Sequence, residues 1–108
     1  MGSRVLVTGL GIISAIGNGT AETLRSIETR RSGIGRLSLF DSIHADIPVA
    51  EVPVSGNDLI RMALPAGNQG HHTRNALLAM TAARQAMDAA HWHRNASLRS
   101  GTVMATTV

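Results

Sequence analysis

The apolar positions of this chain form short continuous runs near the two ends and follow a helical period in between. Residues 4–8 (R-V-L-V-T) are one such run, and residues 101–108 (G-T-V-M-A-T-T-V) are the other. Continuous runs rich in β-branched residues are typical of strands that are covered on both faces. The pattern therefore predicts a buried strand at each end of the chain.

A first helical period follows the Gly17-Asn18-Gly19 turn signal. Thr20 suits the N-cap position, Glu22 lies where a negative charge favours the helix dipole, and Gly33 suits a left-handed C-terminal cap. These signals predict a helix from about residue 21 to 31. Its apolar face would comprise Ala21, Leu24 and Ile27.

Residues 34–70 contain all three prolines and are expected to be rich in loops. Within them, residues 49–52 (V-A-E-V) are a candidate edge strand, and residues 58–64 are a candidate for one or two helical turns.

The longest helical period runs from about Thr73 to His91. Two apolar rows follow it: Ala76, Met80, Ala83, Met87 and Ala90, and Ala79, Ala82, Ala86 and Ala89. The polar residues form one stripe: Arg74, Thr81, Gln85 and Asp88, with Arg84 beside it. A helix that is apolar over most of its circumference is buried between layers. Because 108 residues contain nothing else large enough to wrap it, we expect a covering body outside them.

The expected fold class is α/β, a partial layered fold in which strand, long helix and strand form a βαβ unit. The second strand runs to Val108, so we expect residues 1–108 to be one truncated portion of a domain.

The charge pattern argues against nucleic-acid binding. All ten basic residues are arginines, the net charge is +3, and the arginines are scattered without interleaved aromatic residues. No apolar stretch is long enough to span a membrane, so we expect a cytoplasmic protein. There is no cysteine, which excludes disulfides and thiolate chemistry within these residues.

Two candidate sites are weak. Gly9 and Gly11 follow a predicted strand as in a dinucleotide fingerprint, but Ser14 stands where the third glycine belongs. The pairs His71-His72 and His91/His93 lie at opposite ends of the long helix, about 27 Å apart by helix rise. We therefore predict neither a cofactor nor a metal.

The segment 5–17 (V-L-V-T-G-L-G-I-I-S-A-I-G) resembles the opening of β-ketoacyl-[acyl-carrier-protein] synthases, the synthase II-like condensing enzymes of the thiolase superfamily. Residues 32–35 (S-G-I-G) match the S-G-I motif of that family, Phe40-Asp41 its F-D pair, and residues 49–52 its next short strand. The alanine-rich helix and the last strand continue the same order, so the resemblance covers the whole chain. The histidines at residues 71–72 and the run Ala105-Thr106-Thr107 depart from the family pattern and suggest a divergent branch.

The resemblance implies a thiolase-like layered fold with a mixed sheet and one buried central helix. It implies an acyltransferase that performs a decarboxylating Claisen condensation of acyl and malonyl groups held on acyl carrier protein, in fatty-acid or polyketide synthesis, by a homodimeric parent. The family's catalytic cysteine and two histidines lie beyond Val108, so no catalytic residue is assigned here. Thr107 and Val108 are the candidate substrate-binding residues, because the family places an apolar acyl-pocket residue at the position of Val108.

Two other interpretations stay open. A chain-length-factor-like partner subunit has the same fold but has lost the cysteine, and a stand-alone binding domain would share ancestry only. If the parent is a condensing enzyme or such a partner subunit, we expect the 108 residues alone to be inactive and either aggregated or molten.

Overall fold

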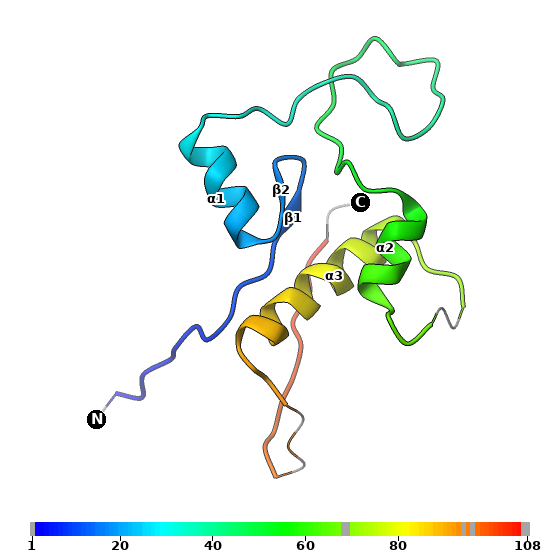
Figure 1. The fold of residues 1–108 in the computed structure, drawn as a ribbon. Helices are drawn as coiled ribbons and strands as arrows, with labels where there is room; N and C mark the ends of the chain where they lie inside the picture. Colours follow the sequence, from blue (N-terminus) through cyan, green and yellow to red (C-terminus); the bar gives the residue numbers. More distant parts are fainter. Residues whose placement is uncertain (1, 68–69, 94, 96, 107–108) are drawn as a thin grey trace.

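The computed structural model describes residues 2–67, 70–93, 95 and 97–106 (Figure 1). These residues form three helices and one two-stranded sheet, in the order β1 (Ile13–Ser14), β2 (Gly17–Asn18), α1 (Thr20–Glu28), α2 (Gly56–Ala63) and α3 (Arg74–Ala89). The chain thus combines helices with a small sheet, which agrees with the α/β class in its general sense. No helix of the described residues is both long and apolar enough to cross a lipid bilayer.

The sheet of the described residues is an antiparallel hairpin, and it lies at neither of the two predicted strands. Ile13 pairs with Asn18 and Ser14 with Gly17, so that two residues form the turn. The Ile16 amide donates to Ser14 Oγ at 3.3 Å within this turn. The apolar run of residues 12–16, which showed no turn signal of its own, is therefore folded back on itself.

The helix predicted over residues 21–31 is confirmed as α1, with different ends. Its N-cap is Gly19 at φ 103°, not Thr20, and the left-handed residue after it is Arg30 at φ 54°, not Gly33. Glu22 lies in the first turn as predicted, and its Oε2 accepts from the Asn18 amide at 2.9 Å.

The other two helices begin at side-chain caps. Ser55 Oγ accepts from the Asp58 amide at 3.1 Å at the start of α2, and Thr73 Oγ1 accepts from the Ala76 amide at 3.2 Å at the start of α3. Each bond satisfies one of the amides that a first helical turn leaves unpaired. The long helix ends at Ala89, two residues before the predicted end, and His91 adopts φ 49° just beyond it.

The core of the described residues is small. Leu59 of α2 and Leu77 of α3 are its buried large apolar side chains, at 0% and 4% exposure. The accessible surface is 9177 Å², whereas a compact monomer of 11.3 kDa has about 5,700 Å². The radius of gyration is 16.6 Å, against about 13 Å for a compact domain of this length. The chain therefore does not form a self-contained globule.

The strands predicted over residues 4–8 and 101–108 are not formed. Residues 4–8 and 101–106 have no strand assignment, and Val5 and Val103 are 94% and 101% exposed. Residues 107–108 lie outside the described part of the chain. A strand needs a neighbouring backbone for its hydrogen-bond ladder, and no ladder is formed at either segment within the described residues. The candidate strand over residues 49–52 is reduced to a single bridge, in which Val49 and Gly35 exchange two bonds of 2.9 Å.

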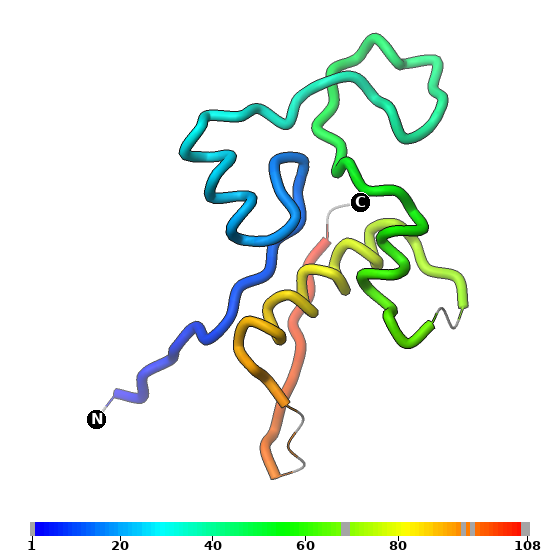
Figure 2. Tube along the Cα trace, viewed as in Figure 1, coloured from blue at the N-terminus to red at the C-terminus, as the bar shows by residue number. Residues whose placement is uncertain are grey.

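Helix α3 lies near the middle of the trace, with α2 on one side and the hairpin on another, while residues 101–106 run alongside it (Figure 2). It is covered on some sides only. Leu77 and Thr81 are buried and Gln85 is half-buried, but Ala83, Met87 and Ala89 are exposed. The described residues therefore leave parts of both apolar rows open, and the covering body expected for Ala83, Met87 and Ala89 stays a prediction.

Candidate functional site

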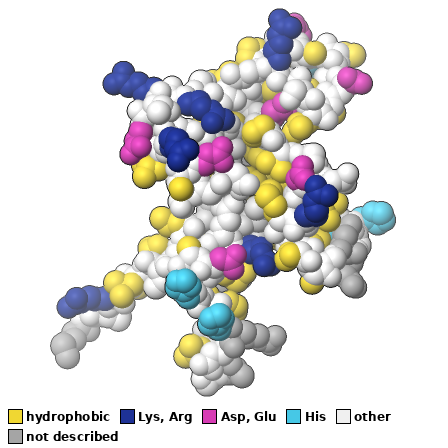
Figure 3. Space-filling model, viewed as in Figure 1, with side chains coloured by type: hydrophobic (Ala, Val, Ile, Leu, Met, Phe, Trp, Pro, Cys, Tyr) yellow, Lys and Arg dark blue, Asp and Glu magenta, His cyan; other side chains and the backbone are white. Residues whose placement is uncertain are grey.

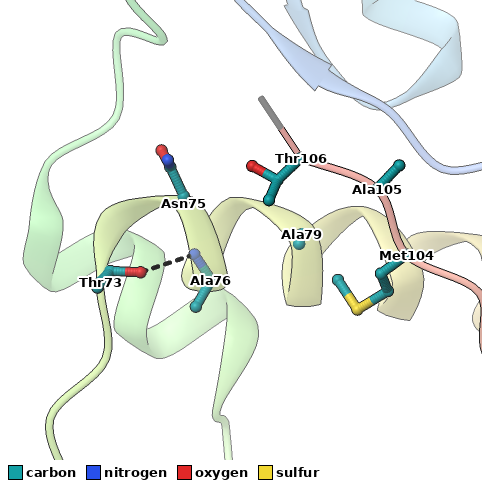
Figure 4. Close-up of a pocket in the computed structure, with 7 residues that line it drawn as sticks. All are labelled: Thr73, Asn75, Ala76, Ala79, Met104, Ala105 and Thr106. Atoms are coloured by element: carbon teal, nitrogen blue, oxygen red, sulfur yellow. Dashed lines mark hydrogen bonds between the residues drawn. The ribbon is translucent and has the colours of Figure 1, made fainter. Parts of the chain in front are cut away.

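The two predicted substrate-binding residues, Thr107 and Val108, lie outside the described residues. The segment that leads to them, residues 104–106, forms a groove of about 550 Å³ with the first turns of α3 (Figure 4). Its lining is mostly small or apolar: Thr73, Asn75, Ala76, Ala79, Met104, Ala105 and Thr106. None of the described lining residues carries a charge at neutral pH, and the groove is mostly apolar.

The segment 9–12 crosses α3 at very close range. A Cβ built on Gly9 would lie 2.1 Å from the carbonyl oxygen of Ala86, and one built on Gly11 would lie 1.9 Å from that of Ala82. Real Cβ atoms do not approach an oxygen this closely, so only glycine fits at either position. The methyl-sized residues of α3 and the two glycines together allow the backbones to touch.

A third glycine contact joins the hairpin to the segment after α1. A Cβ on Gly33 would lie 2.7 Å from the Cβ of Ala15. Thus residues of the two sequence motifs, in segments 5–17 and 32–35, are in direct contact.

Polar side chains hold the hairpin onto α3. Gln85 Oε1 accepts from the Ile12 amide at 2.9 Å, and Gln85 Nε2 donates to Asn18 Oδ1 at 2.8 Å. Asn18 Nδ2 in turn points to Met62 Sδ of α2 at 3.4 Å. The sequence analysis did not predict this network. Two features of the sequence could have indicated it: a glutamine within an alanine-rich helix and an asparagine that precedes a glycine.

Helix α1 packs on the hairpin through its polar face. Ser26 is 3% exposed and donates from Oγ to the Ile16 carbonyl at 2.6 Å, and Thr23 is also buried. By contrast, Leu24 and Ile27 are 56% and 60% exposed. They line an open apolar groove of about 310 Å³ with Leu10, Gly11, Ile12, Thr20 and Thr23. The predicted apolar face of this helix therefore exists but faces outward.

The Glu51 carboxylate connects the two ends of the loop formed by residues 38–51. Its Oε1 accepts from the Ser38 hydroxyl and, at 2.8 Å, from the Ser38 amide. The Ser38 hydroxyl is the main cause that lowers the pKa of the Glu51 carboxyl below its usual value. The Ser38 and Leu39 amides and the charge of Arg74 act in the same direction, against partial desolvation. Arg74 also donates to the Val52 carbonyl at 2.8 Å, which ties this loop to the start of α3.

The described part of the chain contains no group of three His, Asp or Glu side chains that could hold a metal ion. Charged and histidine side chains are dispersed over the visible face, with apolar side chains exposed between them (Figure 3).

No protein-family model, no curated protein and no solved structure matches this chain.

Proposed function

We propose that this chain is the N-terminal portion of a β-ketoacyl-[acyl-carrier-protein] synthase-type condensing enzyme with a thiolase-like layered fold. The proposal starts from the order of motifs described above. The observation that carries it is the crossing of Gly9 and Gly11 over Ala82 and Ala86 of α3, because this contact gives the opening motif and the alanine-rich helix one common physical purpose.

That contact connects parts of the resemblance that are far apart in the sequence. Glycine at both positions permits backbone-to-backbone packing that any side chain would block. Alanines on the facing side of the helix keep the approach close. The contact of Gly33 with Ala15 adds a second pair of motif residues that pack together.

The surface that the described residues leave open also supports the proposal. Both α1 and α3 turn partly polar faces toward the hairpin and expose apolar residues, among them Leu24, Ile27 and Met87. Monomeric soluble proteins rarely leave such patches uncovered. A layered enzyme body would cover these faces and would offer strand partners to residues 4–8 and 101–108.

In this proposal the chain supplies scaffold and binding surface, not reacting groups. A cysteine thiolate beyond Val108 would take the acyl group from acyl carrier protein and release the carrier thiol. Two histidines, also beyond Val108, would assist loss of carbon dioxide from the malonyl thioester, and the resulting enolate would attack the acyl-enzyme and free the cysteine. By the same resemblance, Thr107 and Val108 would line the acyl pocket. The parent would work as a homodimer.

The test uses the longest open reading frame that contains these 108 residues. We expect its product to carry the cysteine and both histidines and to release carbon dioxide from malonyl-[acyl-carrier-protein] in the presence of an acyl donor. Replacing the cysteine by alanine should abolish elongation. A reading frame with the fold but without the cysteine would favour the chain-length-factor-like subunit, and one without any such continuation would favour a stand-alone binding domain.

A paired substitution tests the observation that carries the proposal. Gly11→Val should abolish activity of the same product because its side chain meets the Ala82 carbonyl. Gly56→Ala is the matched control, since a Cβ at Gly56 meets nothing within 4 Å. If the two variants were equally active, the contact of Gly9 and Gly11 with α3 would no longer support the proposed function.

A further inference from the structure

We propose that Asn18-Gly19 is a site of spontaneous deamidation. We propose further that the packing of α3 on the hairpin slows this reaction. Asn18 is the one asparagine in this sequence that is followed by glycine. A glycine after asparagine favours this reaction because it has no side chain to hinder attack by its amide nitrogen. The proposal is independent of the condensing-enzyme assignment.

The reaction is an intramolecular acyl transfer followed by hydrolysis. The Gly19 amide nitrogen loses its proton to solvent and attacks Cγ of Asn18, a C–N bond forms, and the side-chain amide leaves as ammonia. Water then opens the succinimide ring at either carbonyl. The products are aspartate, with the original backbone, or isoaspartate, with one additional backbone carbon.

The structure restrains both reacting groups. The Gly19 amide donates to the Ile12 carbonyl at 2.8 Å, so its proton is held in the hairpin ladder. The Asn18 side chain is bonded at both ends, to Gln85 Nε2 at 2.8 Å and to Met62 Sδ at 3.4 Å. Cyclisation requires the side chain to leave these partners and the amide to leave Ile12. Residue 18 should therefore react mainly from a locally opened state.

Reaction at this position would loosen the structure around it. An aspartate 18 carboxylate would lie near Glu22, whose Oε2 already accepts from the residue 18 amide at 2.9 Å, and like charges repel. An isoaspartate would lengthen the strand and disturb the pairing of Ile13 with residue 18. Gly19, the N-cap of α1, would shift with it. The modification would therefore disturb the pairing within the hairpin and the start of α1.

The experiment follows the conversion of residue 18 in the product of the longest open reading frame that contains these 108 residues. The chain is incubated in mildly alkaline buffer with and without denaturant, digested with trypsin, and the peptide of residues 5–25 is analysed by mass spectrometry for aspartate and isoaspartate. We expect conversion to be several-fold slower in buffer than in denaturant. Equal rates in the two conditions would overturn the proposal.

Three variants separate this protection from general stability. Gln85→Ala should convert several-fold faster than the parent in buffer and at the same rate in denaturant. Arg84→Ala, the neighbouring substitution at a side chain that pairs only with Asp88 among the described contacts, should match the parent. If Gln85→Ala loses its helical circular dichroism, Met62→Leu decides: faster conversion than the parent supports the proposal, and an unchanged rate overturns it.

Discussion

Gln85 of α3 and Asn18 of β2, 67 positions apart in the sequence, are joined by a hydrogen bond of 2.8 Å. The same glutamine accepts from the Ile12 amide at 2.9 Å, so one side chain satisfies both a donor and an acceptor of the hairpin. Because Gly9 and Gly11 cross α3 at Ala86 and Ala82, Gln85 and these two glycines together position the hairpin along the helix.

Gln85→Leu should weaken this attachment. The substitution keeps the helix propensity and the size of the side chain but leaves the Ile12 amide without its partner, a loss of about 1–3 kcal/mol when such a group is buried and less at this half-exposed position. Amide hydrogen exchange is the measurement. The amides of Ile12 and Gly19 should exchange faster, whereas those of α2 should not change. Unchanged exchange at Ile12 would contradict the assigned role of Gln85.

Helix α1 packs on the hairpin through its polar face, which gives a second prediction. Substitution of a serine on that face should lower the stability more than substitution of a leucine on the apolar face. Ser26→Ala removes the bond to the Ile16 carbonyl and should cost about 1 kcal/mol of local stability. Leu24→Ala changes a side chain that is largely exposed and should stay within about 0.5 kcal/mol. Hydrogen exchange of the α1 amides distinguishes the two variants. A larger effect of Leu24→Ala would mean that α1 packs through its apolar face.

The outward apolar face of α1 also shows where sequence reasoning reached its limit. Periodicity located α1 and α3 because helical spacing is a local signal, although the caps predicted for α1, Thr20 and Gly33, differ from the observed Gly19 and Thr29. Which face turns inward was not local: Ser26 and Gln85 are buried or half-buried because the hairpin offers them backbone partners. A hydrophobic pattern takes the apolar side of a helix as the side that faces the core. For α1 this assumption selects the side of Leu24 and Ile27, which faces outward.

The unformed strands have a related physical explanation. Residues 4–8 and 101–106 have the composition of buried strands, but a strand exists only when a second backbone completes its ladder. The partner is a non-local property that a run of valines cannot specify. The hairpin at residues 13–18, by contrast, is formed but was not predicted. Its two-residue turn at Ala15-Ile16 contains none of the residues that usually mark a turn in a sequence.

The small core makes a third prediction about its two leucines. Leu59→Ala should be the most destabilising substitution among the described apolar residues, at about 2–5 kcal/mol, because Leu59 is fully buried and its truncation leaves a cavity. Leu77→Ala should follow closely. Met87→Ala, on the same helix as Leu77 but 42% exposed, is the control and should have little effect. Urea titration of the helical circular dichroism compares the three variants, and a similar midpoint for Leu59→Ala and Met87→Ala would disprove the assigned core.

The open surface predicts how the 108 residues behave in isolation. They should retain helical circular dichroism, bind a hydrophobic dye strongly, and associate as the concentration rises, since exposed apolar faces and unpaired backbone favour contacts between copies. Dye fluorescence and analytical ultracentrifugation measure both properties. The double variant Leu24→Ser and Ile27→Ser should reduce dye binding without loss of helix. A monomer that binds no dye would contradict the open surface described here.

Acid should release the loop that Glu51 fastens. The Ser38 hydroxyl and the neighbouring amides lower the pKa of the Glu51 carboxyl, so the charged form is favoured in the folded state. For a lowered pKa, the contribution to stability is present above the unfolded value, 4.5, and is lost as the pH falls through the folded value. The amides of Ser38 and Leu39 should therefore exchange faster, relative to those of α2, once the pH falls below about 4.5. Glu51→Gln keeps an acceptor without the charge, and its Ser38 amide should show no such acid-dependent step. If the step persists in Glu51→Gln, another acid controls the loop.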